Sequence, residues 1–180
     1  MPVSSNVRPH NTKLAQDNMK TITAIFVTII IATGCATEGE RPKGEVLKSG
    51  ICVQRETDRY AQPQSTAGYA TLGDMQITQE ATTIPLRKNI AFGFTWRASG
   101  MPAEPEVDFI IRHPKITRPD GKTLEGFTEP LRLTTEGGVV QSTDCYALSE
   151  DHELVPGLWS ITVSYQGRVL ASRQYTVRAQ

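Results

Sequence analysis

The stretch NIAFGFTWRA, residues 89–98, decides the fold class. Every second side chain in it is large and apolar, namely Ile90, Phe92, Phe94 and Trp96. Because a β-strand points alternate side chains to opposite faces, this stretch presents one apolar face to a core and one small or polar face outward. It therefore predicts a half-buried antiparallel strand, with Trp96 near the centre of the core.

Two later segments alternate in the same way, Glu106–Arg112 and Gly157–Tyr165. The second carries Trp159, which we expect to share the core with Trp96. After it, Gln166-Gly167 predicts a tight hairpin turn into a closing strand. Weaker alternation predicts further strands at Val46–Arg55, Asp74–Thr83, Pro130–Thr135 and Gly138–Leu148, and the closing strand at Arg168–Val177.

The strand spacing and the absence of a sustained helical period in the sequence define the expected architecture. Residues 46–180 are predicted to form an all-β domain, an immunoglobulin-like antiparallel β-sandwich of seven or eight strands. Pro114 is expected to end the strand before it, and Lys115–Thr128 to be the longest loop, turning at Pro119-Asp120-Gly121.

The first 34 residues have the pattern of an export signal. Met19-Lys20 precedes the 12 uncharged residues 21–32, and Thr33-Gly34-Cys35 follows. A membrane-spanning helix needs roughly 20 apolar residues, so this run is too short to span comfortably. We predict a signal peptide over 1–34. Residues 1–18 are polar and aperiodic, which makes Met19 an alternative true start to Met1.

Ala32-Thr33-Gly34-Cys35 resembles the lipobox of bacterial lipoproteins. The resemblance implies that Cys35 carries diacylglycerol and becomes the first residue of the mature chain. Residues 35–45 would then be a lipidated flexible tether, because they are polar and rich in Gly and Pro. Ala36 favours the outer membrane and a periplasm-facing domain. The alternatives are an ordinary signal peptide with an incidental cysteine, or a buried β-rich segment.

Charge limits the possible partners. Removing residues 1–34 takes away three basic and one acidic residue, which leaves 16 Lys and Arg against 18 Asp and Glu. Without a basic stripe to neutralise phosphates, the domain is not expected to bind nucleic acid. The expected partners are the membrane, through the lipid anchor, and an envelope protein or glycan.

Cys52 and Cys145 remain once Cys35 is assigned to lipid. Because an exported domain meets an oxidising compartment, we predict a disulfide between these two cysteines. The alternative is two separate buried thiols that pack as small apolar side chains.

Histidines are the natural centres of catalysis or metal binding, and the mature chain has two, His113 and His152. His152 lies in Glu150-Asp151-His152-Glu153, which offers oxygen ligands to a divalent cation but lacks the spacing of a known metal loop. An acidic surface turn is the preferred interpretation. No nucleophile motif accompanies either histidine, so neither an enzyme, a cofactor nor a metal site is predicted.

Four aromatic residues lie in or beside polar, turn-rich segments: Tyr60, Tyr69, Phe127 and Tyr146. If several are exposed on one edge of the domain, they could form a binding patch for peptide, sugar or another envelope protein. The alternative, which the sequence alone favours, is that they are scattered surface aromatics.

Several short patches resemble a bacterial family of exported proteins catalogued as a domain of unknown function. In this sequence they are Gly50-Ile51 with Glu56-Thr57, Glu80–Pro85 leading into Phe92-Gly93-Phe94, Glu153–Trp159, and Tyr165–Leu170. The resemblance covers about residues 46–178 and implies a compact β-domain. It implies no activity, cofactor or catalytic residue.

Together these patterns predict a non-enzymatic cell-envelope lipoprotein whose β-sandwich binds an unknown ligand. Two alternatives stay open. One is a small periplasmic hydrolase or metal-dependent enzyme using His113 or His152. The other is a purely structural envelope component.

Overall fold

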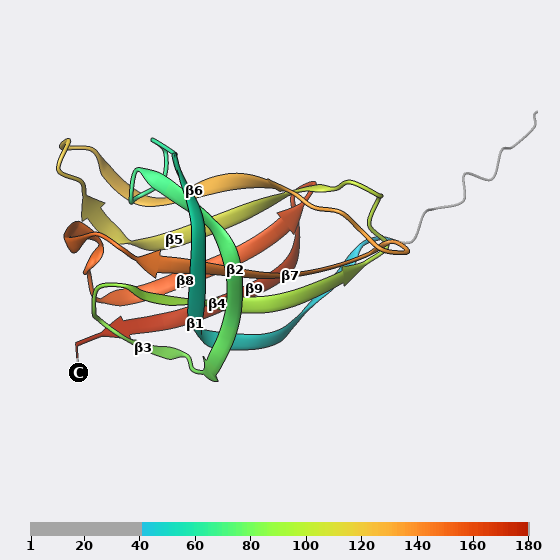
Figure 1. The fold of residues 1–180 in the computed structure, drawn as a ribbon, viewed down its shortest axis with the longest axis horizontal. Helices are drawn as coiled ribbons and strands as arrows, with labels where there is room; N and C mark the ends of the chain where they lie inside the picture. Colours follow the sequence, from blue (N-terminus) through green and yellow to red (C-terminus); the bar gives the residue numbers. More distant parts are fainter. Residues whose placement is uncertain (1–40, 180) are drawn as a thin grey trace, which may run out of the picture. The chain divides into compact units, whose positions relative to one another are not determined.

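The computed structural model describes residues 41–179, in nine strands and one short 3-10 helix (Figure 1). The predicted signal peptide, the lipobox, Cys35 and most of the predicted tether lie outside the described residues. Among those described, no helix is long and apolar enough to cross a bilayer. The elements are β1 (Lys43–Ala61), β2 (Tyr69–Glu80), β3 (Thr83–Pro85), β4 (Ile90–Ser99), β5 (Glu106–Thr117), β6 (Thr123–Arg132), β7 (Val139–Leu148), η1 (Asp151–Glu153), β8 (Gly157–Tyr165) and β9 (Arg168–Arg178).

The strands form two sheets, so the predicted all-β sandwich is confirmed. The four-stranded sheet has the order β2-β1-β4-β7, and the five-stranded sheet has the order β3-β9-β8-β5-β6. The predicted count of seven or eight strands is wrong, because β3 adds a ninth. Three residues are too few to show alternation in a sequence. β3 also pairs in parallel with β9, whereas the other strand pairs are antiparallel.

The core lies between the sheets and uses the predicted faces. Phe92, Trp96 and Trp159 are almost completely buried. The Phe92 ring lies edge-on to Trp159 and to Tyr175, with ring centres 5.8 and 5.1 Å away. The Tyr175 hydroxyl donates to the carbonyl oxygen of Gly93 at 2.6 Å, which joins the two sheets at their centre. The alternation read from β4 is therefore the packing pattern of the core.

β1 is much longer than predicted and belongs to two pairings. Its first part, from Lys43 to Cys52, pairs with β4, and its second part, from Gly50 to Ala61, pairs with β2. The changeover is at Gly50, where φ is 153° and an added Cβ would lie 2.0 Å from the carbonyl oxygen of Gln79. Register shifts on both sides of this point bend the strand. The tether prediction is thus too long, since residues 43–45 are already paired.

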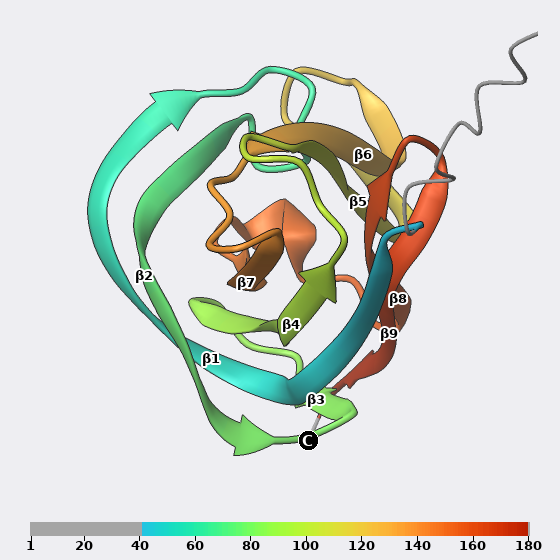
Figure 2. The same ribbon diagram turned by 90° about the vertical axis from the view of Figure 1, so that its right-hand side faces the viewer.

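The bend carries the β1–β2 hairpin around the outside of β4 and β7 (Figure 2). We call the part of this hairpin beyond Cys52, residues 53–77, the strap. Where it crosses the sheet, Met75 and Ile77 pack against a small second core on the outer face. That core is made of Cys52, Ala91 and Cys145, whose small side chains let the strap approach closely.

Two further strand ends differ from the predictions. β5 passes through Pro114 and ends only at Thr117, so the predicted loop Lys115–Thr128 is mostly a hairpin. Proline is tolerated there because the ladder is interrupted between Arg112 and Ile116, where no amide is needed. The turn that joins the strands lies at Pro119-Asp120-Gly121, as predicted. Gln166-Gly167 also makes its predicted turn, with positive φ at both residues.

Candidate functional site

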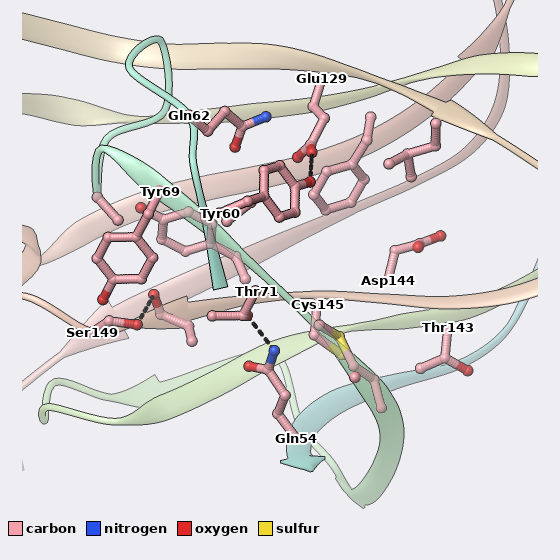
Figure 3. A pocket seen from close by; sticks show the side chains of 18 of the residues that line it. Gln54, Tyr60, Gln62, Tyr69, Thr71, Glu129, Thr143, Asp144, Cys145 and Ser149 are labelled. Atoms are coloured by element: carbon pink, nitrogen blue, oxygen red, sulfur yellow. Dashed lines mark hydrogen bonds between the residues drawn. The ribbon is translucent and has the colours of Figure 1, made fainter. Parts of the chain in front are cut away.

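A cavity of about 310 Å³ lies under the strap, beside β6 and β7 (Figure 3). β6 and β7 are edge strands of the two sheets, so the cavity occupies an open side of the sandwich. Its lining mixes aromatic, small apolar, amide, hydroxyl and carboxylate groups. The lining residues are Gln54, Tyr60, Gln62, Ala67, Tyr69, Ala70, Thr71, Gly73, Met75, Phe109, Phe127, Glu129, Leu131, Ser142, Thr143, Asp144, Cys145, Tyr146, Ala147 and Ser149.

The four aromatic residues singled out from the sequence all line this cavity: Tyr60, Tyr69, Phe127 and Tyr146. Sequence reasoning favoured scattered surface aromatics, and the structure instead brings them together. They are not all exposed, however. Phe127 and Tyr146 are buried at 8% and 7% exposure, whereas Tyr60, on the strap, is 42% exposed. The gathering of these rings from β1, β2, β6 and β7 makes the cavity the candidate site.

Two carboxylates contribute the charge of the lining. Asp144 accepts a hydrogen bond from the Trp96 indole at 2.5 Å and another from the Ser142 hydroxyl at 3.2 Å. Burial raises the pKa of Asp144, the hydrogen bonds from Trp96 and Ser142 lower it in part, and the charge of Glu129 raises it. Asp144 and Glu129 therefore repel each other as charged groups. The donors Trp96 and Ser142 are neutral, so they do not cancel the charge of Asp144.

Glu129 also holds the strap. Its carboxylate accepts a hydrogen bond from the Tyr60 hydroxyl at 2.6 Å (Figure 3), which links β1 to β6. This hydrogen bond is the largest cause of a pKa of about 12 for Tyr60. A second polar contact within the strap joins the Gln54 amide to the Thr71 hydroxyl. The strap, which covers the cavity, is thus held by one hydrogen bond within itself and by another to the five-stranded sheet.

The loop at the end of the strap is docked by both histidines. Nε2 of His113 lies 2.7 Å from the Thr66 hydroxyl, and Nε2 of His152 lies 3.0 Å from the Thr66 carbonyl oxygen. Arg118 donates to the carbonyl oxygens of Pro63 and Ser65 at 2.7 and 3.1 Å. Both histidines therefore help to hold this loop in place.

The acidic turn Glu150–Glu153 disperses its side chains instead of gathering them. Glu150 accepts from the Tyr69 hydroxyl at 3.0 Å, and Asp151 pairs with Lys88 at 3.0 Å. Glu153 is completely buried, where its carboxylate accepts from the Tyr146 hydroxyl and from the backbone amides of Ser149 and Glu150. Within residues 41–179, no group of three His, Cys, Asp or Glu side chains could hold a metal ion.

Cys52 and Cys145 are joined by a disulfide bond, with their Cα atoms 6.7 Å apart. The bond links β1 to β7 across β4, at the base of the strap. Between them, Gly93 of β4 leaves no room for a side chain, since an added Cβ would lie 2.5 Å from the Cα of Cys145. The bridge therefore fastens the strap beside the cavity, whose lining includes Cys145.

Sequence reasoning missed Asp144 and Glu129 as site residues. One signal for Asp144 was present. Every second residue of β7 faces inward, and Asp144 shares this face with Val140, Ser142, Tyr146 and Leu148. A carboxylate on a mainly apolar face indicates a buried polar group with a partner. Glu129 gave no comparable signal, because its neighbours on β6 alternate weakly.

Comparison with solved structures identifies the class of fold. An immunoglobulin-like protein from Pseudomonas aeruginosa is similar, with a TM-score of 0.56 and 20% identity over 78% of this chain and 99% of that chain. The chain is thus an immunoglobulin-like β-sandwich. An alkylpurine DNA glycosylase from Pseudomonas fluorescens, bound to DNA, covers 54% of this chain and 28% of its own at 20% identity. Its TM-score of 0.34 supports no argument.

Family comparison is more specific. The chain matches the domain of unknown function DUF3859 over residues 40–177, and it belongs to that family. A search of curated proteins gave no match. The expected membership of a family without assigned function is therefore confirmed, whereas the lipoprotein signal is not addressed by these comparisons.

Proposed function

We propose that this chain is a non-enzymatic binding protein of the bacterial cell envelope, anchored by lipid on Cys35, and that its ligand occupies the cavity under the strap. The observation that carries the proposal is the cavity itself. Ligand sites are typically concave, with apolar and aromatic walls and a few placed polar groups, and have volumes of roughly 300–1,000 Å³. This cavity has that lining and about 310 Å³.

The contacts of the histidines support binding over catalysis. The Nδ1 atom of His113 lies 2.7 Å from the carbonyl oxygen of Pro114, and its other nitrogen contacts Thr66. Burial lowers the pKa of His113, and its ring packs on Trp159 with centres 4.9 Å apart. Both ring nitrogens of His113 thus contact groups of the protein, and His113 does not line the cavity. We therefore assign it to holding the loop in place and not to catalysis.

A cavity-filling variant tests the site. Ala70 lines the cavity from β2, and Ala70→Trp should fill much of the space. Val169→Trp adds the same bulk on a residue that is 58% exposed and outside the lining, so it is the matched control. We expect small ligands that raise the melting temperature of the full chain in a screen to lose this effect with Ala70→Trp only. Ligands that stabilise all three proteins equally would contradict a cavity site.

The envelope anchor is tested separately. The lipobox resemblance at Ala32-Thr33-Gly34-Cys35 motivates it, and the intact mass of protein extracted from membranes measures it. We expect the mass of a chain that begins at Cys35 and carries acyl chains, and we expect Cys35→Ala to release the protein from the membrane fraction. An unmodified chain that begins upstream of Cys35 would refute the anchor and leave the cavity unaffected.

A further inference from the structure

We propose that the cavity under the strap binds an organic cation, an ammonium or guanidinium group carried on an apolar stem. This inference rests on the proposed binding function and specifies the chemistry of its ligand. The positions of two carboxylates, the surrounding rings and the size of the cavity carry it.

The carboxylates set the sign of the ligand charge. Glu129 and Asp144 both line the cavity, and none of the described residues that line it is Lys, Arg or His. The donors to them among the hydrogen bonds described above, Tyr60 for Glu129 and Trp96 and Ser142 for Asp144, are neutral. Neutral donors stabilise a carboxylate without cancelling its charge. A cation entering the cavity would therefore gain attraction from two carboxylates in a partly desolvated place.

The aromatic rings favour a cation with a carbon stem over a bare metal ion. Tyr60, Tyr69, Phe109, Phe127 and Tyr146 supply ring surfaces to the lining. Aromatic faces attract organic cations, and surround ammonium groups in known recognition sites. One of these rings already contacts a cation of the protein. The guanidinium carbon of Arg59, which does not line the cavity, lies 4.2 Å from the centre of the Tyr69 ring.

The size of the cavity and its apolar wall limit the ligand to one small cation or one long basic side chain. About 310 Å³ is at the lower end of the volumes of ligand sites. Leu131, Met75 and Ala147 add aliphatic contacts to the rings, which would cover the methylene groups of a stem. The ammonium chemistry is shared by a free diamine and by a lysine of a partner protein.

Three five-carbon probes differ mainly in charge: 1,5-diaminopentane, 1,5-pentanediol and glutarate. Calorimetric titration of the full chain should give binding of the diamine, with affinity for the diol at least about tenfold weaker and none for glutarate. Binding of the diamine should weaken as salt is raised. Equal binding of the diol would overturn the cation inference and leave the binding function standing.

Isosteric variants locate the site. Asp144→Asn and Glu129→Gln keep the size of the side chain, and their amide oxygens can still accept from Trp96 and Tyr60. Each should weaken diamine binding about tenfold or more. Glu104→Gln removes a charge from an exposed loop residue that does not line the cavity, and should leave binding unchanged. Unfolding curves identify any variant that fails to fold. If Asp144→Asn does not fold, Glu129→Gln still tests the inference, because Glu129 is only half-buried. Unchanged affinity in a folded carboxylate variant would refute the inference.

The source of the cation is separated by a second pair of probes, a blocked Gly-Lys-Gly peptide and its norleucine counterpart. Binding of the lysine peptide alone supports a basic side chain of a partner protein, and binding of the diamine alone supports a free amine. Failure of every cationic probe overturns the cation inference. If, in addition, every ligand found in the melting-temperature screen stabilises Ala70→Trp as much as the wild type, the binding function itself is refuted.

Discussion

His113 of β5 and His152 of η1 both contact Thr66, in the loop between β1 and β2. Because a carbonyl oxygen only accepts, Nδ1 of His113 donates to that of Pro114. Burial lowers the pKa of His113, so at neutral pH its Nε2 has no proton and accepts from the Thr66 hydroxyl. Nε2 of His152 donates to the Thr66 carbonyl oxygen by the same reasoning. The end of the strap is therefore held by a neutral His113.

The first prediction concerns pH. Burial, and secondarily the charge of Arg112, lower the pKa of His113, against the hydrogen bond to Pro114 and the charge of Glu125, which raise it. The unfolded chain then binds a proton near pH 6.5, and the folded chain only at lower pH. The free energy of unfolding should fall as pH decreases from about 7 through the folded pKa.

The His113→Gln variant isolates this contribution. Its urea unfolding free energy should lose the part of the pH slope that His113 causes, so the wild-type minus variant difference shrinks towards low pH. Asp144 and Glu153 have raised pKa values and act in the opposite sense, but they are common to both proteins. Parallel pH profiles for wild type and variant would contradict the prediction.

The second prediction concerns the bridge between Cys52 and Cys145. It closes a loop over a sequence separation of 93 residues. Loop-closure entropy and measured cases suggest that its loss costs about 2–5 kcal/mol. We expect the double variant Cys52→Ala with Cys145→Ala to show this decrease in urea unfolding. The oxidised wild type should be lighter by two hydrogen atoms than its reduced form, and a reducing agent without effect on stability would count against the bridge.

The third prediction concerns the buried pair of Tyr146 and Glu153. Tyr146→Phe removes a donor from a carboxylate that is completely buried, and it should lower the free energy of unfolding by about 1–3 kcal/mol. It should also raise the pKa of Glu153 further, because the Tyr146 hydrogen bond lowers that pKa. Tyr165→Phe is the control, since its hydroxyl accepts an exposed hydrogen bond from Gln166, and should change stability by less than about 0.5 kcal/mol.

The fourth prediction concerns Gly93. Gly93→Ala would place a Cβ 2.1 Å from the carbonyl oxygen of Asp144, so β4 and β7 must separate. We expect a loss of about 1–3 kcal/mol or more in unfolding free energy. Thr95→Ala, on the same strand, introduces no clash. It removes a methyl group and the hydroxyl that contacts Thr143, and should cost about 1 kcal/mol. Equal losses would show that the close approach at Gly93 is relieved cheaply.

The parts of the fold that alternate strongly could be predicted, and the parts that pack outside the core could not. β4 was clear because one face of it is the core, and the β8–β9 hairpin was clear from Gln166-Gly167. The second half of β1 was not, because residues 54–61 are mainly polar and lie in the strap, away from the main core. A strand without an apolar face has no period-two signal.

The site could be predicted only in part for a related reason. Tyr60, Tyr69, Phe127 and Tyr146 attracted notice as aromatics in polar surroundings, yet which of them share a cavity depends on where the strap bends. Gly50 determines that bend through a backbone conformation and a close contact that its neighbours in the sequence do not reveal. The partners of Glu129 likewise depend on the strap reaching β6.

The shortness of β3 has a consequence for how copies of the domain behave when crowded. A second molecule that tried to extend the five-stranded sheet would meet a ladder of only three residues, Thr83–Pro85, at one margin. At the other margin it would meet β6, where Pro130 has no amide and where proline is accepted because its nitrogen faces away from the neighbouring strand. Neither margin templates a long intermolecular ladder. The five-stranded sheet should therefore not extend from one molecule to the next.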